Sequence, residues 1–100
     1  MVIVGGTFEF EPDQREAFLV AQHETMRKSR SEPGCLEYTF SADPLDPGRV
    51  LLFERWVDQE SVDTHLAGLR DAPPSPGPSV VPKAASIVLY DVAAERPLGG

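Results

Sequence analysis

The stretch VLLFERWVDQESVDTHL, residues 50–66, holds the side chains best suited to chemistry. It contains the only tryptophan of the chain, Trp56, and a histidine nine positions later, His65. Because an unperturbed histidine has a pKa of about 6.5, His65 is the best candidate for a general base near neutral pH. Trp56 can stack on an aromatic ring or donate a hydrogen bond through its indole N–H.

Three further residues are candidates for binding the same small molecule. Tyr38 offers a second ring with a hydroxyl, and Glu54 or Arg55 can position a bound ligand. Each candidate also has an ordinary structural interpretation. Trp56 and Tyr38 are typical of a core, and His65 can form a hydrogen bond between a helix and a sheet. The residues alone favour this structural interpretation of His65.

The sequence lacks the usual motifs for a metal or a cofactor. His23 and His65 lie 42 positions apart and Cys35 is the only cysteine, so no recognisable metal-ligand spacing is present. Neither G-x-G-x-x-G nor a P-loop motif occurs. We therefore expect no metal and no tightly held nucleotide or flavin, and we interpret Cys35 as a small buried apolar residue.

The composition indicates an acidic globular protein. Apolar residues make up 41% and charged residues 25% of the chain, which are ordinary values for a folded domain. The net charge of −7 would repel the phosphates of nucleic acid. The first residues do not resemble a signal peptide, and no apolar run approaches the roughly 20 residues that span a bilayer. We expect a cytoplasmic protein that binds neither nucleic acid nor a membrane.

The elements that must position the candidate residues follow the order βαββαβ. Alternation of apolar and polar residues predicts four strands, at 2–10, 35–43, 49–57 and 86–92. Helix signals predict one helix from about 12 to 31, which Pro33 and Gly34 end, and a second from Asp58 or Ser61 to about Arg70. Gly5 and Gly6 lie inside the first strand, where we predict a bulge.

These elements predict a single domain over residues 1–93, with a C-terminal tail at 94–100. The fold class is α+β: a ferredoxin-like sandwich with two helices on one face of a four-stranded antiparallel sheet. The loop DPLDPGR would join the second and third strands as a hairpin. Residues 50–53 are apolar on both sides of the third strand, which indicates that both faces are covered. Five prolines between residues 73 and 82 predict a stiff, extended loop.

Several short motifs in this order resemble the antibiotic biosynthesis monooxygenase family. They are EPGCLEY after the first helix, LFERW in the third strand, His65 in the second helix and VLYDV in the last strand, and the resemblance covers residues 2–93. It implies a dimeric α+β barrel in which the sheets of two chains face one another. The small size and the two apolar faces of the third strand likewise predict a tight homodimer.

The resemblance also implies a function. The family includes oxygenases of polycyclic phenols, quinol monooxygenases and haem-degrading enzymes. Cofactor-free oxygenation would need His65 as the base, Trp56 and Tyr38 around the ring, and Arg55 or Glu54 to position it, with a small aromatic substrate and dioxygen as partners. With the resemblance, a catalytic and a structural role for His65 are both open. The alternative function is a non-catalytic dimeric small-molecule-binding or accessory protein.

Two departures from the family bear on the substrate. The chain contains no asparagine, which the haem-degrading branch uses in its first strand, about where Gly6 stands here. His65 stands roughly where that branch has a tryptophan, so haem degradation is disfavoured. The segment after the second helix is rich in proline and cannot form one continuous helix over the pocket. The identity of the substrate therefore stays open.

Overall fold

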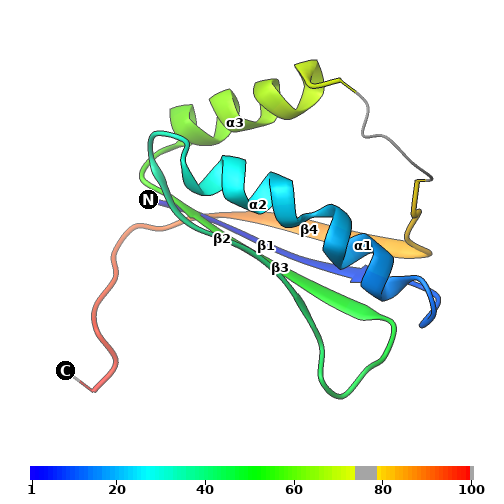
Figure 1. Ribbon diagram of the computed structural model, residues 1–100. Helices are drawn as coiled ribbons and strands as arrows, with labels where there is room; N and C mark the ends of the chain where they lie inside the picture. Colours follow the sequence, from blue (N-terminus) through cyan, green and yellow to red (C-terminus); the bar gives the residue numbers. More distant parts are fainter. Residues whose placement is uncertain (74–78, 100) are drawn as a thin grey trace.

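The computed structural model describes residues 1–73 and 79–99, and all its helices lie on one face of a four-stranded antiparallel sheet (Figure 1). The sheet has the order β2-β3-β1-β4. This arrangement confirms the predicted ferredoxin-like α+β fold. The elements are β1 (Val2–Glu9), α1 (Arg15–Ala21), α2 (His23–Arg30), β2 (Cys35–Ala42), β3 (Arg49–Trp56), α3 (Gln59–Asp71) and β4 (Ala84–Asp91).

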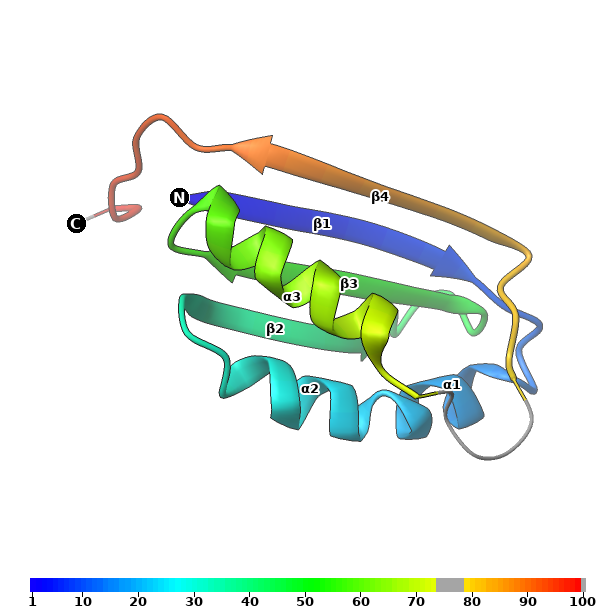
Figure 2. The same ribbon diagram turned by 90° about the horizontal axis from the view of Figure 1, so that it is seen from above.

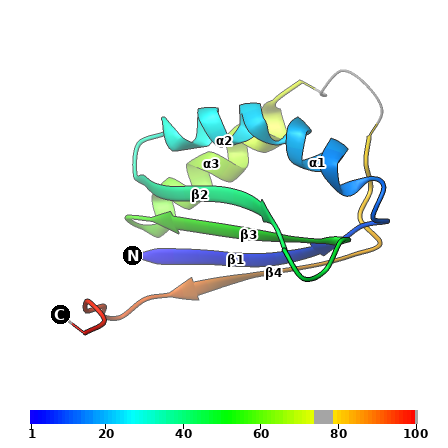
Figure 3. The same cartoon turned by 60° about the horizontal axis from the view of Figure 1, so that its bottom comes forward.

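The helices cover the sheet unevenly. α1 and α2 pack on β2, whereas α3 packs on β3. Seen from above, α3 runs over the middle of the sheet and β4 lies outside the helix layer (Figure 2). The opposite face of the sheet carries no helix (Figure 3). The two faces of the sheet therefore have different surroundings within one chain.

The first helix region is divided into two segments rather than the single predicted helix from 12 to 31. α1 and α2 meet at Gln22, whose N–H approaches the carbonyl oxygens of both Phe18 and Leu19 at 3.1 Å. A shared bond of this kind tightens the local turn, and the sequence around Gln22 has no proline or glycine to signal it. α1 also begins later than predicted, because Pro12 lies in a turn closed by the bond from Gln14 N–H to Glu11.

α3, which corresponds to the second predicted helix, begins at its predicted N-cap. The Asp58 carboxylate accepts hydrogen bonds from the Ser61 backbone N–H at 2.9 Å and the Ser61 hydroxyl at 2.7 Å, so Asp58 is the N-cap. Gly34 lets the loop after α2 pack against this helix start. Its φ is +85°, and a Cβ there would lie 2.7 Å from the Ser61 Cβ. This close contact brings residues before β2 next to α3.

The bulge predicted at Gly5 and Gly6 is wrong. Both residues pair without a register shift with β3 and β4, and the irregularity lies between Cys35 and Glu37 in β2. A Cβ at Gly6 would lie 3.3 Å from Ile87 Cγ1, and one at Gly5 would lie 3.6 Å from the Tyr90 ring. The two glycines therefore make room for side chains of β4 rather than for an extra residue.

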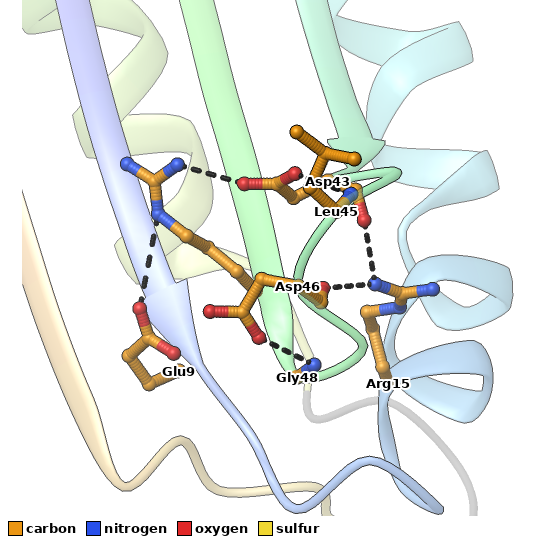
Figure 4. A network of polar contacts seen from close by, with 7 residues as sticks. Glu9, Arg15, Asp43, Leu45, Asp46 and Gly48 are labelled. Carbon is orange, nitrogen blue, oxygen red and sulfur yellow. Dashed lines mark hydrogen bonds and ion pairs between the residues drawn. The ribbon is translucent and has the colours of Figure 1, made fainter.

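The β2–β3 loop is held by a polar network (Figure 4). The Arg15 guanidinium at the start of α1 donates to the carbonyl oxygens of Asp43 at 3.1 Å and Asp46 at 2.7 Å. Arg49 pairs with the Asp43 carboxylate at 2.9 Å. Hydrogen bonding by the Leu45 backbone N–H and by Arg49 lowers the pKa of Asp43. The predicted hairpin is thereby confirmed, with its loop fixed to the first helix.

The last described residues follow β4. β4 ends at Asp91, and residues 93–99 are exposed and form neither helix nor strand. The domain boundary at residue 93 stays a prediction. Of the proline-rich loop predicted at 73–82, residues 74–78 lie outside the described part. None of the helices in the described ranges is long and apolar enough to cross a membrane, and the cytoplasmic location stays a prediction.

Candidate functional site

A cavity of about 310 Å³ lies between α3 and the helix-covered face of the sheet. This volume is at the small end of the range for ligand pockets, about 300–1,000 Å³. Four lining residues are 40–56% exposed and form its mouth between α3 and β4: Leu66, Leu69, Ile87 and Leu89. The other lining residues are Val4, Phe8, Tyr38, Phe40, Leu52, Glu54, Val62 and His65.

His65 brings a titratable group to this apolar wall. It is only 2% exposed, and its ring centroid lies 4.8 Å from that of Trp56 and 5.2 Å from that of Tyr38. Its Nδ1 lies 2.7 Å from the Glu32 carboxylate. A carboxylate can only accept, so Nδ1 carries the proton in this bond. In the neutral ring, Nε2 then keeps its lone pair and can act as a base.

Glu32 is the site residue that sequence reasoning missed. It lies in the turn between α2 and β2, 33 positions before His65. The motif EPG marks the end of a helix and contains no signal for a partner on α3. Only the tertiary packing at Gly34 brings the carboxylate to the imidazole. The pair also lines a shallow outer hollow, so Glu32 contacts solvent on the side away from the cavity.

Glu54 is a buried acid on the floor of the cavity. It is 6% exposed and lies between Val4 of β1 and Tyr38 of β2 in the sheet register. Burial raises the pKa of the Glu54 carboxyl, while the hydrogen bond from Trp56 and the charge of His65 oppose this rise. Because burying an acid costs free energy, and no lysine or arginine lines the described cavity, Glu54 is a candidate for function.

Trp56 supports the site from behind. It is fully buried and does not line the cavity, and its indole Nε1 donates to Glu54 Oε1 at 3.0 Å. The role of Trp56 in stacking on or hydrogen-bonding a ligand stays a prediction. Trp56 packs against His65 and orients Glu54, because β3 places alternate residues on the same face.

Tyr38 lines the cavity, and its hydroxyl stays neutral. Burial raises the pKa of the Tyr38 hydroxyl above its ordinary value, the charge of Glu54 adds to the rise, and a hydrogen bond with Ser29 opposes it. Its ring meets those of Trp56 and His65 edge to face. Tyr38 can thus contribute an aromatic wall and a neutral hydroxyl, but not a base.

Arg55 lies apart from the other candidates. It occupies the opposite face of β3, where its guanidinium pairs with Glu37 at 3.8 Å. Arg55 therefore lies across the sheet from this cavity, because successive side chains of a strand point to opposite faces, and its role in positioning a ligand stays a prediction. Of the five predicted residues, three line the cavity, Trp56 lies behind it and Arg55 lies across the sheet.

Comparison with known structures finds the same fold in several proteins. A protein of Deinococcus radiodurans that carries the name of antibiotic biosynthesis monooxygenase matches with a TM-score of 0.79 and 23% identity, and all of both chains is covered. A Pseudomonas aeruginosa protein matches with a TM-score of 0.74 and 24% identity, covering 93% of this chain and 94% of that chain. At these identities the likeness shows the fold alone.

The sequence comparisons identify the family. An uncharacterized protein of Synechocystis sp. is 29% identical, over 97% of this chain and 67% of that protein. The family model described as antibiotic biosynthesis monooxygenase matches residues 1–69, which carry β1 to β3, most of α3 and every ionisable group of the cavity. By this match, the chain belongs to the antibiotic biosynthesis monooxygenase family.

Proposed function

We propose that this protein is a cofactor-independent monooxygenase of a quinol or polyphenolic aromatic compound, which binds in the cavity under α3. One observation carries the proposal: a buried histidine, oriented by a carboxylate at Nδ1, forms part of an otherwise mostly apolar cavity wall. Such a wall excludes water and accepts a flat ring. The histidine supplies the base that would turn a phenolic compound into an electron-rich anion.

The first step is removal of a proton from the substrate. His65 Nε2 would take the proton of a phenolic or enolic hydroxyl, and the Glu32 carboxylate would stabilise the resulting imidazolium through the bond at Nδ1. The substrate anion then passes an electron to dioxygen, so the substrate itself is the reductant. Glu32 acts as a positioning residue, because it holds the ring and fixes its tautomer without touching the substrate.

For a hydroxyanthrone the overall reaction balances without a further reductant. The ring methylene and dioxygen become a carbonyl and water: two C–H bonds and the O–O bond break, one C=O bond forms, and one oxygen leaves as water. The carbon is oxidised and dioxygen is reduced. The proton that His65 takes in the first step returns to the oxygen that leaves, so His65 serves first as base and then as acid.

A second candidate function is small-molecule binding without turnover. The observation that favours it is the mutual hydrogen bonding of the polar groups, with His65 paired to Glu32 and Trp56 paired to Glu54. Buried polar groups that satisfy one another are also what a structural core requires. In that case the cavity would still bind an aromatic compound, but no bond of the ligand would change.

Oxygen uptake distinguishes the two functions. Purified protein, without added metal or flavin, is mixed with a panel of hydroquinones and hydroxyanthrones, and oxygen consumption is compared with the uncatalysed rate. Consumption above that rate, with a carbonyl product, is the expected result. A compound that raises the melting temperature of the protein but leaves oxygen consumption at the uncatalysed rate would support binding without turnover.

We also propose that two copies associate through the open face of the sheet. Phe53 lies at the centre of this open face and is 45% exposed. Gly5 pairs with both Phe53 and Val88 in the neighbouring strands. Tyr90 is likewise exposed one row away, beside Ile3. An apolar patch with a polar rim is typical of a protein interface, and here the Arg55–Glu37 pair forms part of that rim.

A further inference from the structure

Glu54 has hydrogen-bonding capacity that the fold does not use. Its Oε1 accepts from Trp56, but a carboxylate can accept several hydrogen bonds, and no second donor to Glu54 occurs among the described residues. No lysine or arginine lines the cavity in the part of the chain described. Val50 and Leu52, on the same face of β3, show that an apolar residue is the ordinary choice at such a position.

Glu54 and His65 come from different elements but lie beside the same side chain, Trp56. Glu54 belongs to β3 and His65 to α3, and both side chains line the same cavity. Trp56 connects them, since its ring packs on His65 while its N–H binds Glu54. A flat ligand between them would meet two polar groups at neighbouring positions of its edge, with apolar walls elsewhere.

We propose that Glu54 determines substrate specificity by accepting a hydrogen bond from a second hydroxyl, adjacent to the oxygen that His65 deprotonates. This inference rests on the proposed function and narrows its substrate class to aromatics with two neighbouring hydroxyls. In the enol form of an anthrone, the central oxygen would face His65 and a flanking hydroxyl would face Glu54. A site built to pair with a hydroxyl discriminates strongly against the analogue that lacks it.

The same carboxylate excludes anionic ligands. Glu54 lies in the cavity and Glu32 lies directly behind His65, so two negative groups surround a single imidazole. No lysine or arginine in the described lining would compensate a ligand carboxylate. A ligand carboxylate buried beside Glu54 would have no partner of opposite charge. The resulting repulsion would strongly lower the affinity for such a ligand. The preferred ligand is therefore a neutral polyphenol rather than an aromatic acid.

The test compares Glu54→Gln with the wild-type protein in anaerobic binding measurements. Glutamine has nearly the same size, and its amide oxygen can still accept from Trp56 while its NH₂ group donates toward the cavity. Three probes are titrated by quenching of Trp56 fluorescence: anthrone, its analogue dithranol with a hydroxyl on each side of the carbonyl, and a ring-carboxylated dithranol. Glu54→Asp, which keeps the charge, is the matched control.

We expect the wild-type protein to bind dithranol about tenfold or more tightly than anthrone, since hydrogen bonds to charged groups contribute that much. In Glu54→Gln this preference should largely disappear, while the affinity for anthrone changes little. The wild-type protein and Glu54→Asp should both reject the carboxylated probe, and Glu54→Gln should bind it more tightly. These changes would be specific to the ligand, which a structural role alone would not produce.

An equal loss of affinity for anthrone and dithranol in Glu54→Gln would overturn the inference, since Glu54 would then only support the fold. Failure of the wild-type protein to bind any probe, or to prefer dithranol, would overturn it as well. Because dioxygen is absent, the outcome is independent of turnover. Intact discrimination in a protein that consumes no oxygen would contradict the proposed monooxygenase but support the role of Glu54.

Discussion

The two faces of β3 carry similar apolar side chains in very different surroundings. On the helix-covered face, Val50 and Trp56 are fully buried, whereas Phe53 on the open face is nearly half exposed. Alternate residues of one strand thus belong either to a closed core or to an open surface. Both faces carry large apolar side chains, so their different exposure depends on what covers each face. The helices of one chain cover only one.

The charged residues of β3 differ between the faces in the same way. Arg55 on the open face pairs with Glu37 and remains partly exposed. Glu54 on the covered face is buried in a cavity wall without lysine or arginine, and it accepts only from Trp56 among the described residues. An exposed ion pair is common on protein surfaces and does not indicate a function. A buried acid, by contrast, lowers the stability of the fold, so its presence calls for a functional explanation. We therefore place the chemistry on the covered face and association on the open face.

Removing the base on the covered face should have the largest effect. We expect His65→Ala to lower turnover by about 10² to 10⁴, the usual contribution of positioned proton transfer. Association of the two copies should persist, because His65 lies on the side of the sheet away from the open face. Oxygen uptake at matched folded concentration measures the loss, with circular dichroism as the control. Full activity in a folded variant would return His65 to a structural role.

A charge on the open face should separate the copies and leave the cavity intact. Phe53→Asp would place an unpaired carboxylate at the centre of the proposed interface, and we expect association to weaken by about 30-fold or more. Sedimentation should change from a dimer to a single chain of 10.9 kDa.

Ligand binding provides the control for Phe53→Asp. The described residues of one chain suffice to form the cavity, so we expect binding of dithranol to survive dissociation. A wild-type protein that already sediments as a stable monomer at micromolar concentration would contradict the proposed dimer. Loss of binding together with association would indicate that the partner completes the cavity.

Loss of the carboxylate behind the base should cost less than loss of the base. In Glu32→Gln the amide can donate to Nδ1, which would favour the tautomer with the proton on Nε2. We expect a fall in turnover of about 10- to 100-fold, as for partners that orient a functional group. Glu32→Asp should recover part of the activity, and equal rates for Gln and Asp would argue against control of the tautomer.

The alternation in the sequence explains which parts of this site could be foreseen. The period of two in RVLLFERW predicts the strand correctly, and it also separates Arg55 from Glu54 and Trp56, a signal that identifies Arg55 as the residue on the other face. Asp58 is recognisable because a helix cap is a local feature. The Glu32–His65 pair is not local, since 33 positions separate its members and only the packing at Gly34 joins them.

The buried acid should leave a signature in the dependence of stability on pH. Burial raises the pKa of Glu54 above its ordinary value of 4.5, so the native state binds this proton more tightly than the unfolded state. The contribution of Glu54 to stability is then fully present below the unfolded-state pKa and is lost as the pH rises through the raised folded-state pKa.

Glu54→Gln removes this titration, so its stability relative to the wild-type protein should increase as the pH rises through the raised folded-state pKa of Glu54, and then level off. Urea unfolding at a series of pH values and one protein concentration measures the difference, in which the titrations of groups remote from Glu54 cancel. A difference that stays constant with pH would mean that the Glu54 carboxyl titrates alike in the folded and unfolded states.

The smallest effects should come from the two glycines of β1, which place the same substitution on opposite faces. At Gly5 an added Cβ would lie 3.6 Å from the Tyr90 ring, an ordinary contact on the open face. At Gly6 it would lie 3.3 Å from both Ile87 Cγ1 and the Ser86 carbonyl oxygen on the covered face. Neither glycine has a positive φ, so alanine strains neither backbone.

Gly5→Ala should therefore stabilise the protein by about 0.4–1 kcal/mol, because alanine lowers the entropy of the unfolded chain. Gly6→Ala should leave the stability unchanged or lower it, because Ile87 and a backbone carbonyl group must shift to make room for the methyl group. Because Ile87 also lines the cavity, Gly6→Ala should weaken dithranol binding, which Gly5→Ala should leave unchanged. Urea midpoints and binding titrations of the pair provide the measurement. Equal stabilisation by both substitutions would mean that the covered face accommodates a methyl group as readily as the open one.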